Sequence, residues 1–334
     1  MNKIQIILSA LAIMVLTACE TTFYDEEQYR KEIYIVSYDN NIFGQEYTYG
    51  EGSTGYISIY AAGTTPIDRD VTVEIEVYPD YLRNFNKRVY GEDYTHYAKE
   101  LDPADYQIES MTTTLKAGSK EPYVQLPIRV NINNLDPDGE YYIPLRIKSV
   151  SDYMISPDKQ NVLYRVYVKN DYSTTKSTTY YTMNGTEQKF TITDGVYTPS
   201  EAITTVNATK PVVPTGQYTI RMLPNAMTND ALNNSMNIHV FPTEMVDVPV
   251  YVEGMATGQT VKRQKVELTT WIESSQSLII KNLEGIDIDA TVNERFSYYD
   301  PDTKRFTLNY RYKSPGEDVW RFMHEEVYPL KNNE

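Results

Sequence analysis

The sequence has 334 residues, and its 46 Asp and Glu outnumber its 31 Lys and Arg, which gives a formal charge of −15. A chain this acidic has no general attraction to phosphate backbones, so its composition excludes nucleic acid as a general partner. The length suffices for two ordinary domains. We assign most of the 31 Tyr residues to half-buried strands, where tyrosine is favoured, while noting that tyrosine also presents amphipathic faces to ligands.

Residues 1–18 have the pattern of a secretory signal peptide. Lys3 precedes an apolar run from Ile4 to Leu16, which is too short to span a bilayer comfortably. Residues 16–19, LTAC, resemble the bacterial lipobox, and Cys19 is the only cysteine in the chain.

In lipobox proteins the cysteine sulfur takes a diacylglycerol, the signal is cut before it, and the new N-terminus is usually acylated too. Several acyl chains, at ~0.8 kcal/mol per buried methylene, anchor a protein far more firmly than one. We therefore predict lipidation of Cys19, with a free or buried cysteine as the alternative.

The part of the chain that follows the signal begins with a polar, acidic segment. Residues 19–32 are predicted to form a lipidated tether. Residues 33–172 alternate with period two, which predicts an N-terminal immunoglobulin-like β-sandwich of roughly seven strands. Three strands place their apolar residues on one face: Val71, Val73, Ile75 and Val77; Tyr141, Ile143, Leu145 and Ile147; and Val162, Tyr164, Val166 and Val168. A short inserted helix is expected from Asp80 to Val89.

Residues 173–334 are predicted to form a second antiparallel β domain, a sandwich or a barrel-like sheet. The domain boundary is placed near the start of a segment rich in Ser, Thr and Asn, residues 169–186. Strand-sized units follow at 216–223, 236–242, 248–254, 265–273, 277–282, 307–314 and 319–330. Residues 225–235 and 300–304 are expected to be a loop and a turn. No internal repeat indicates a solenoid or a propeller.

The order of several segments resembles a known pair of domains. VTVEIEVYPDYLRNFN, LDPADYQIE, TTLKAGSKEPYVQLPIRV and YYIPLRIKS resemble the N-terminal domain of unknown function common in Bacteroidota glycan-utilisation lipoproteins. SYYDPDTKRFTLNYRY, residues 297–312, and the tryptophan strand after it resemble the C-terminal domain that often accompanies the first. Phe85-Asn86 stands where that family has Tyr-Asn, residues 101–103 interrupt its Leu-Pro, and the segment between them is longer than usual.

This resemblance implies an outer-membrane lipoprotein encoded beside a starch-utilisation-type transporter pair. Such proteins most often act as surface glycan-binding accessories, so the implied partners are a glycan, the transporter pair and glycosidases of the same locus. The family pattern supplies neither catalytic nor binding residues. Surface-exported members tend to carry acidic residues directly after the lipidated cysteine, whereas here Glu20 is adjacent and the cluster 25–27 lies further on. Display on the cell surface is therefore expected, with the periplasmic face as the alternative.

The sequence contains no complete motif for catalysis or cofactor binding, so the chain is predicted to be neither an enzyme nor a cofactor protein. HEEVY at His324 lacks the second histidine of a zincin helix. The acidic segments 135–139 and 298–304 lack the ligand count of an EF-hand, and Asp-Pro-Asp favours turns. Two alternative functions remain open. One is an exported glycoside hydrolase, which needs two suitably spaced carboxyl groups; the other is a structural or adhesive pilus-like lipoprotein.

Carbohydrate recognition uses aromatic rings against sugar C–H groups, with polar side chains nearby. In residues 265–273, Val266, Leu268, Thr270 and Ile272 are expected on the apolar face, which places Trp271 on the polar face with Glu267, Thr269 and Glu273. The candidate glycan-binding residues are Trp271, Trp320, Tyr298 and Tyr299. Tyr310 and Tyr312 share their strand phase with Phe306 and Leu308, which predicts that they belong to the core.

Overall fold

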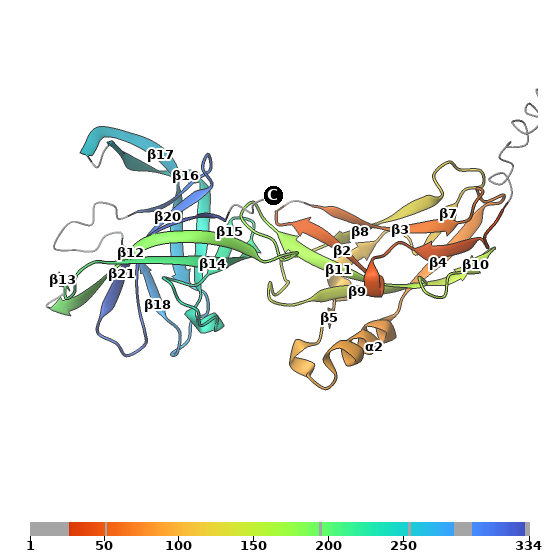
Figure 1. The fold of residues 1–334 in the computed structure, drawn as a ribbon, viewed down its shortest axis with the longest axis horizontal. Helices are drawn as coiled ribbons and strands as arrows, with labels where there is room; N and C mark the ends of the chain where they lie inside the picture. Colours follow the sequence, from red (N-terminus) through yellow and green to blue (C-terminus); the bar gives the residue numbers. More distant parts are fainter. Residues whose placement is uncertain (1–26, 51, 194–195, 253–254, 284–295, 331–334) are drawn as a thin grey trace, which may run out of the picture. The chain divides into compact units, whose positions relative to one another are not determined.

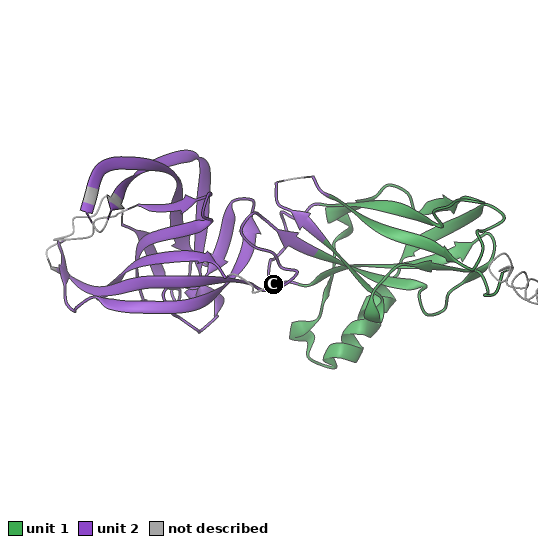
Figure 2. Ribbon diagram, turned by 45° about the horizontal axis from the view of Figure 1, so that its top comes forward, with its two compact units in different colours: residues 1–45, 54–130, 140–166 green, residues 46–53, 131–139, 167–334 purple. Residues whose placement is uncertain are grey.

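The computed structural model describes residues 27–50, 52–193, 196–252, 255–283 and 296–330 (Figure 1). Cys19, the signal peptide and most of the predicted tether lie outside this range. The described chain forms two compact units, which Figure 2 colours separately. The first unit contains the chain up to Gln45 together with Thr54–Val130 and Glu140–Val166. The second contains Glu46–Ser53, Asn131–Gly139 and the chain from Tyr167 onward.

The first unit is a β-sandwich of two mainly antiparallel sheets. One sheet has the order β10 (Met154–Ile155), β1 (Glu32–Ile35), β3 (Thr54–Ala62), β8 (Tyr123–Val130), β6 (Tyr106–Ile108). The other has the order β2 (Ile42–Thr48), β11 (Asn161–Lys169), β9 (Tyr141–Val150), β4 (Val71–Val77), β7 (Thr112–Leu115), and β5 (Lys99–Glu100) also pairs with β9. The chain thus has eleven described strands before residue 172 rather than about seven. The additional strands have two to four residues, too few for a period to be read.

The predicted apolar faces of this unit are confirmed. The buried residues are Val71, Val73 and Ile75 of β4, all four predicted residues of β11, and Ile143, Leu145 and Ile147 of β9. The remaining predicted residues, Val77 and Tyr141, are half-buried. On the opposite face of the same sheet, Tyr142 and Leu163 are also buried, because a helix covers them.

The predicted helix is present as α2 (Pro79–Tyr90), which begins with a proline and ends at Gly91. Proline suits the first turn of a helix, where its missing N–H has no partner to lose. Leu82 and Phe85 pack from α2 onto Tyr142 and Leu163 of the sheet. Short 3₁₀ turns at Asp39–Asn41, Tyr94–His96, Pro103–Asp105 and Leu232–Asn234 complete the helical segments of the described chain.

The second unit is a closed antiparallel β-barrel. Its strands are β12 (Thr179–Thr193), β14 (Thr204–Gly216), β15 (Thr219–Met222), β16 (Met236–Val252), β17 (Met255–Thr270), β19 (Ser297–Asp300), β20 (Arg305–Lys313) and β21 (Trp320–Pro329). Each pairs with the next, and β21 pairs back to β12, which closes the sheet. Two shorter strands are attached to it: β13 (Val196–Pro199) pairs with β12, and β18 (Ile279–Asn282) pairs with β20.

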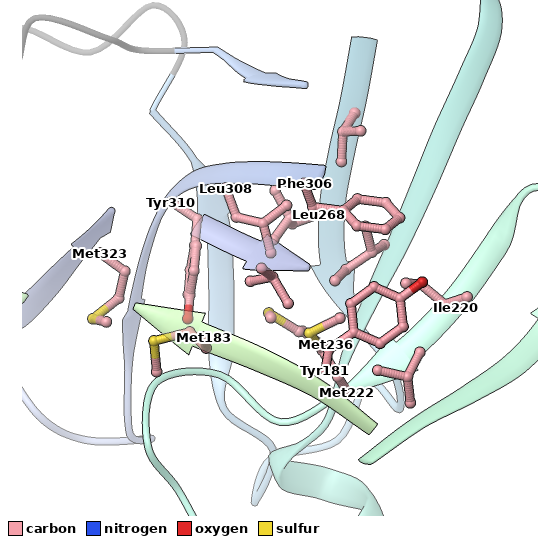
Figure 3. Close-up of a cluster of buried hydrophobic side chains, with 14 of the residues drawn as sticks. Tyr181, Met183, Ile220, Met222, Met236, Leu268, Phe306, Leu308, Tyr310 and Met323 are labelled. Carbon is pink, nitrogen blue, oxygen red and sulfur yellow. The ribbon is translucent and has the colours of Figure 1, made fainter. Parts of the chain in front are cut away.

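Side chains fill the barrel, as expected for about eight strands. Figure 3 shows part of this core, where methionines and aromatic rings from opposite sides of the barrel meet. Tyr310 and Tyr312 are 0% and 2% exposed, which confirms them as core residues. The segment 169–186, expected to be a boundary region, contains the start of β12, and β14 was not expected at all. Their many Thr, Asn and Pro residues hide the alternation that the other strands display.

Candidate functional site

The outer face of the barrel carries a continuous set of polar and aromatic residues on β15, β16, β17 and β19. Cross-strand register places them in three rows: Arg221, Asn237 and Thr269; Thr219, His239 and Glu267; and Phe241, Lys265 and Tyr298. The residues that alternate with them, such as Ile220, Ile238 and Leu268, are buried in the barrel. Strand alternation therefore directs these nine side chains outward, and we call them the outer strip.

Trp271 lies at the end of the outer strip, half-buried, directly after β17 ends at Thr270. Its backbone N–H donates to the carbonyl of Ser235 at 3.0 Å, and the guanidinium carbon of Arg221 lies 5.2 Å from its ring centroid. The prediction that Trp271 lies with polar neighbours agrees with this position. The accompanying placement of Ile272 on the apolar face is wrong, because the strand has already ended and Ile272 is 40% exposed.

Arg221 is fixed beside Trp271 by a two-pronged ion pair. Its Nη1 donates to Oδ2 of Asp138 at 2.7 Å, and its Nη2 donates to Oδ1 of the same carboxylate. Only 7% of Arg221 is exposed. A planar guanidinium held by two parallel hydrogen bonds keeps its orientation, so it forms a rigid support for the indole ring.

The middle of the outer strip offers polar groups next to aromatic rings. Thr219 Oγ1 and His239 Nδ1 lie 2.9 Å apart, and the rings of His239 and Phe241 have centroids 4.4 Å apart. The Nζ of Lys265 lies 5.4 Å from the centroid of Phe241 and 2.7 Å from a carboxylate oxygen of Glu267. The buried Oδ1 of Asn237 has no hydrogen-bond partner within the described chain. Rings, hydroxyl, imidazole, amide and charged groups thus stand on one face.

Two of the predicted candidates lie elsewhere. Trp320 is only 7% exposed and packs with Phe190, Leu283 and Phe322 in a separate small cluster. The guanidinium carbon of Arg311 lies 4.6 Å from its ring centroid, so the ring already makes contacts within the protein. Tyr299 is 7% exposed and lies in the barrel core, 4.6 Å from the centroid of Phe306. Burial raises the pKa of Tyr299 to about 12. Neither residue presents an open ring face.

Tyr298, by contrast, lies in the outer strip, half-buried and directly opposite Lys265. The structure therefore brings together two of the four candidates, Trp271 and Tyr298, on one face. Sequence reasoning did not identify Asp138, Arg221 or Asn237 as their neighbours. Arg221 and Asn237 follow the strand alternation and could have been found from it, but Asp138 comes from a distant loop that carries no such signal.

Carboxylates inside the barrel are engaged in a structural network. Glu325 is fully buried, and its Oε2 accepts from Nζ of Lys210 at 2.6 Å. Its Oε1 accepts from the Tyr310 hydroxyl at 2.7 Å and from the backbone N–H of Asn225 at 2.8 Å. Burial lowers the pKa of Lys210, although the carboxylate of Glu325 acts in the opposite direction. These contacts leave Glu325 neither solvent access nor a free oxygen with which to act on a substrate.

The described residues contain no group of three His, Cys, Asp or Glu side chains that could hold a metal ion. Asp136 and Asp300, which head the two Asp-Pro-Asp segments, each accept a hydrogen bond from the backbone N–H two residues later. These are turn contacts, as the sequence predicts. His324 lies in strand β21 rather than in a helix, with its Nδ1 2.8 Å from Oδ1 of Asn309. No helix in the described ranges is long and apolar enough to cross a membrane.

Comparisons with solved structures show a similar fold in two proteins of Bacteroides ovatus. A protein of unknown function from Bacteroides ovatus is 13% identical with a TM-score of 0.55, and the match covers 91% of this chain and 98% of that one. A multidomain protein from B. ovatus that includes DUF1735 is 15% identical with a TM-score of 0.51, covering 90% and 95%. An auxiliary nutrient-binding protein from Bacteroides thetaiotaomicron is 14% identical with a TM-score of 0.48, covering 87% and 91%. No curated protein matches the chain.

Two family models match the sequence in the order of the two units. A model described as an N-terminal domain matches residues 29–154, and its companion, described as C-terminal, matches residues 160–328. A sandwich followed by a closed barrel thus defines a two-domain class of protein. The chain belongs to the family that these paired models describe, the two-domain Bacteroidota glycan-utilisation family that its sequence resembles.

Proposed function

We propose that this protein is a non-catalytic glycan-binding lipoprotein of the outer membrane. It captures oligosaccharide or polysaccharide for a neighbouring transporter, and the barrel's outer strip with Trp271 forms its binding face. The single observation that carries this proposal is the half-buried Trp271, supported by the fixed guanidinium of Arg221 and lying beside a face of polar side chains.

The chemistry of this face suits a sugar. A pyranose has an apolar face of C–H groups that packs on an aromatic ring, and hydroxyl groups at its rim that need hydrogen-bond partners. Trp271 supplies an aromatic surface with a rigid support, while His239 and Glu267 supply donors and acceptors. Binding sites commonly combine aromatic walls with a few polar groups that fix the orientation of the ligand. Membrane attachment through Cys19 and delivery to a transporter are supported by the lipobox and by the family.

The binding face is tested by affinity electrophoresis and calorimetry of the mature chain against neutral and acidic polysaccharides. Trp271→Ala is expected to weaken binding of the recognised glycan about tenfold or more, a loss of ~1.4 kcal/mol or above. Tyr180→Ala is the matched control, because Tyr180 is an aromatic residue of the same barrel, 46% exposed, on β12 and outside the outer strip. Equal affinities of the two variants would reject this face, and turnover of any glycan by the purified chain would favour the hydrolase alternative. Labelling of cells with a palmitate analogue, with Cys19→Ala as control, checks the anchor.

A further inference from the structure

The segment that follows helix α2 forms a compact aromatic cluster on the surface of the first unit. Tyr94 and Tyr97 have ring centroids 5.0 Å apart, and Tyr90 lies 6.3 Å from Tyr97 and 6.5 Å from His96, the last pair stacked with an interplanar angle of 24°. We call these four residues the Tyr94 platform. They belong to the segment 79–108, which interrupts the strand pattern of the sequence.

Hydrogen bonds fix the backbone on both sides of the Tyr94 platform. Gly91 ends the helix with φ of 61°, a left-handed conformation that glycine adopts readily, and its carbonyl accepts from the Tyr97 hydroxyl at 2.6 Å. Next along the chain, Ala98 exchanges two hydrogen bonds with the buried side chain of Asn86: its N–H donates to Oδ1 at 3.0 Å, and its carbonyl accepts from Nδ2 at 2.8 Å. Both ends of the segment 91–98 are therefore fixed to α2.

Tyr94 itself is 71% exposed, although its ring centroid lies 5.0 Å from that of Tyr97. Clusters of exposed aromatic side chains commonly mark a binding surface. Removing such rings from water lowers the free energy, and a bound ligand can supply that burial. Fixing the base of such a cluster also reduces the ordering cost when a ligand binds. The Tyr94 platform thus has the exposure and the rigidity of a recognition site.

Polar groups surround the platform. The carboxylate of Asp93 accepts from the Thr95 hydroxyl at 2.5 Å and lies 2.8 Å from Nδ1 of His96. These two contacts, that of Thr95 being the larger, lower the pKa of Asp93, so it is an ionised acceptor at neutral pH. Glu92 is exposed beside it, and residues 91–97 include neither Lys nor Arg. Carboxylates accept hydrogen bonds from sugar hydroxyls but repel anionic sugars.

From these features we infer that the Tyr94 platform is a second saccharide-binding site, located on the first unit and selective for neutral sugars. The inference rests on the proposed glycan function and extends it, because it gives the sandwich a binding role of its own rather than that of a spacer. Tyr94 stacks on the apolar face of the sugar, and Asp93 and Glu92 accept its hydroxyl groups.

The test uses the full mature chain and measures Kd by calorimetry for amylopectin, xyloglucan, galactomannan, yeast mannan, polygalacturonate and chondroitin sulfate. Tyr94→Ala is expected to weaken binding of a neutral glycan about tenfold, whereas Tyr94→Phe, which keeps the ring, is expected to stay within about twofold. Tyr56→Ala is the matched control, because Tyr56 is a tyrosine of the same unit, 41% exposed on strand β3. The unfolding temperature of Tyr94→Ala should equal that of the wild type, since the side chain is mostly in water.

The variants of the two sites separate the two proposals. Trp271→Ala is measured in parallel. If Tyr94→Ala binds a neutral glycan more weakly than the wild type, the platform is supported, whatever the affinity of Trp271→Ala. If Trp271→Ala abolishes binding and Tyr94→Ala leaves it unchanged, the platform is rejected and the barrel site stands. A Tyr94-dependent affinity for polygalacturonate or chondroitin sulfate would overturn the selectivity for neutral sugars. If the wild-type chain binds none of the six glycans, both proposals are rejected.

Discussion

The two units differ in how many polar residues they bury. Of the eleven buried polar or charged residues in the described chain, ten lie in the barrel unit and only Asn86 lies in the sandwich. The sandwich core is built from aliphatic side chains such as Ile33, Ile59 and Val71. The barrel interior contains methionines, tyrosines and an ion pair. Each unit therefore depends on a different kind of buried polar contact: one neutral amide in the sandwich and a charged pair in the barrel.

A buried ion pair gives little net stability, because removing two charges from water costs about as much as their attraction returns. What it does impose is a strong penalty on arrangements that separate the partners. Lys210 lies on β14 and Glu325 on β21, and both strands pair with β12. On that strand, Gly185 stands opposite Glu325, and a Cβ there would lie 2.4 Å from the His324 carbonyl oxygen. Close strand contact and a matched pair of charges together favour a single register at the closure of the barrel.

The largest effect is expected from Glu325→Ala. This change leaves Lys210 charged and buried without its partner, which should destabilise the barrel by ~3–5 kcal/mol. Hydrogen exchange measured by mass spectrometry should show faster exchange in peptides of β12, β14 and β21, while peptides of the sandwich strands keep their rates. The double variant Lys210→Met, Glu325→Leu is the control, because it removes both charges and should be markedly more stable than the single variant. A single variant as stable as the wild type would contradict a structural role for the pair.

An intermediate effect is expected in the sandwich from Asn86→Ala. The change leaves the N–H and carbonyl of Ala98 without their side-chain partner, which should cost ~1–3 kcal/mol in all. Faster exchange is expected for residues 91–98, with the barrel peptides unchanged. Asn86→Asp serves as the comparison, because it keeps the acceptor for the Ala98 N–H and loses the donor. If Asn86→Ala left the exchange of this segment unchanged, the amide would not be what holds the Tyr94 platform.

The same contrast explains what could be predicted from sequence. The sandwich strands alternate cleanly, so Val71, Val73 and Ile75 were assigned to the core, and the helix at Asp80–Val89 differs from α2 by only one residue at each end. In the barrel, Lys210 looks like a solvent-facing residue, because its partner Glu325 is 115 residues away and only the closed sheet brings them together. A buried lysine also interrupts the apolar alternation of β14, whose many Thr, Asn and Pro residues, like those of β12, already hide the strand.

The candidate site was predictable to a similar, limited degree. The phase of β17 placed Trp271 among polar residues, which is where it lies. The phase alone could not show that Trp320 is covered, since its burial depends on the distant residues Phe190 and Leu283. Tyr299 lies instead in the barrel core, on the opposite side of its strand from Tyr298. The Tyr94 platform has no strand period at all. Its only signal in the sequence is the density of aromatic residues in an irregular segment.

The smallest effect is expected from Tyr312→Phe, which tests how far the polar network of the barrel extends. The Tyr312 hydroxyl accepts from Nδ2 of Asn225 at 2.9 Å and donates to Oε2 of Glu187 at 3.4 Å, and burial raises its pKa to about 12. Without the hydroxyl, Nδ2 of Asn225 still donates to Glu187 at 2.5 Å, so no buried donor loses its last partner. The cost should therefore be that of an ordinary hydrogen bond, ~0.5–1.5 kcal/mol. The loss is measured as the change in free energy of unfolding in urea, with hydrogen exchange of the β20 peptides as the local readout. A destabilisation as large as that of Glu325→Ala would show that the hydroxyl and the ion pair act as one unit, and the distinction between charged and neutral contacts in the barrel would fail.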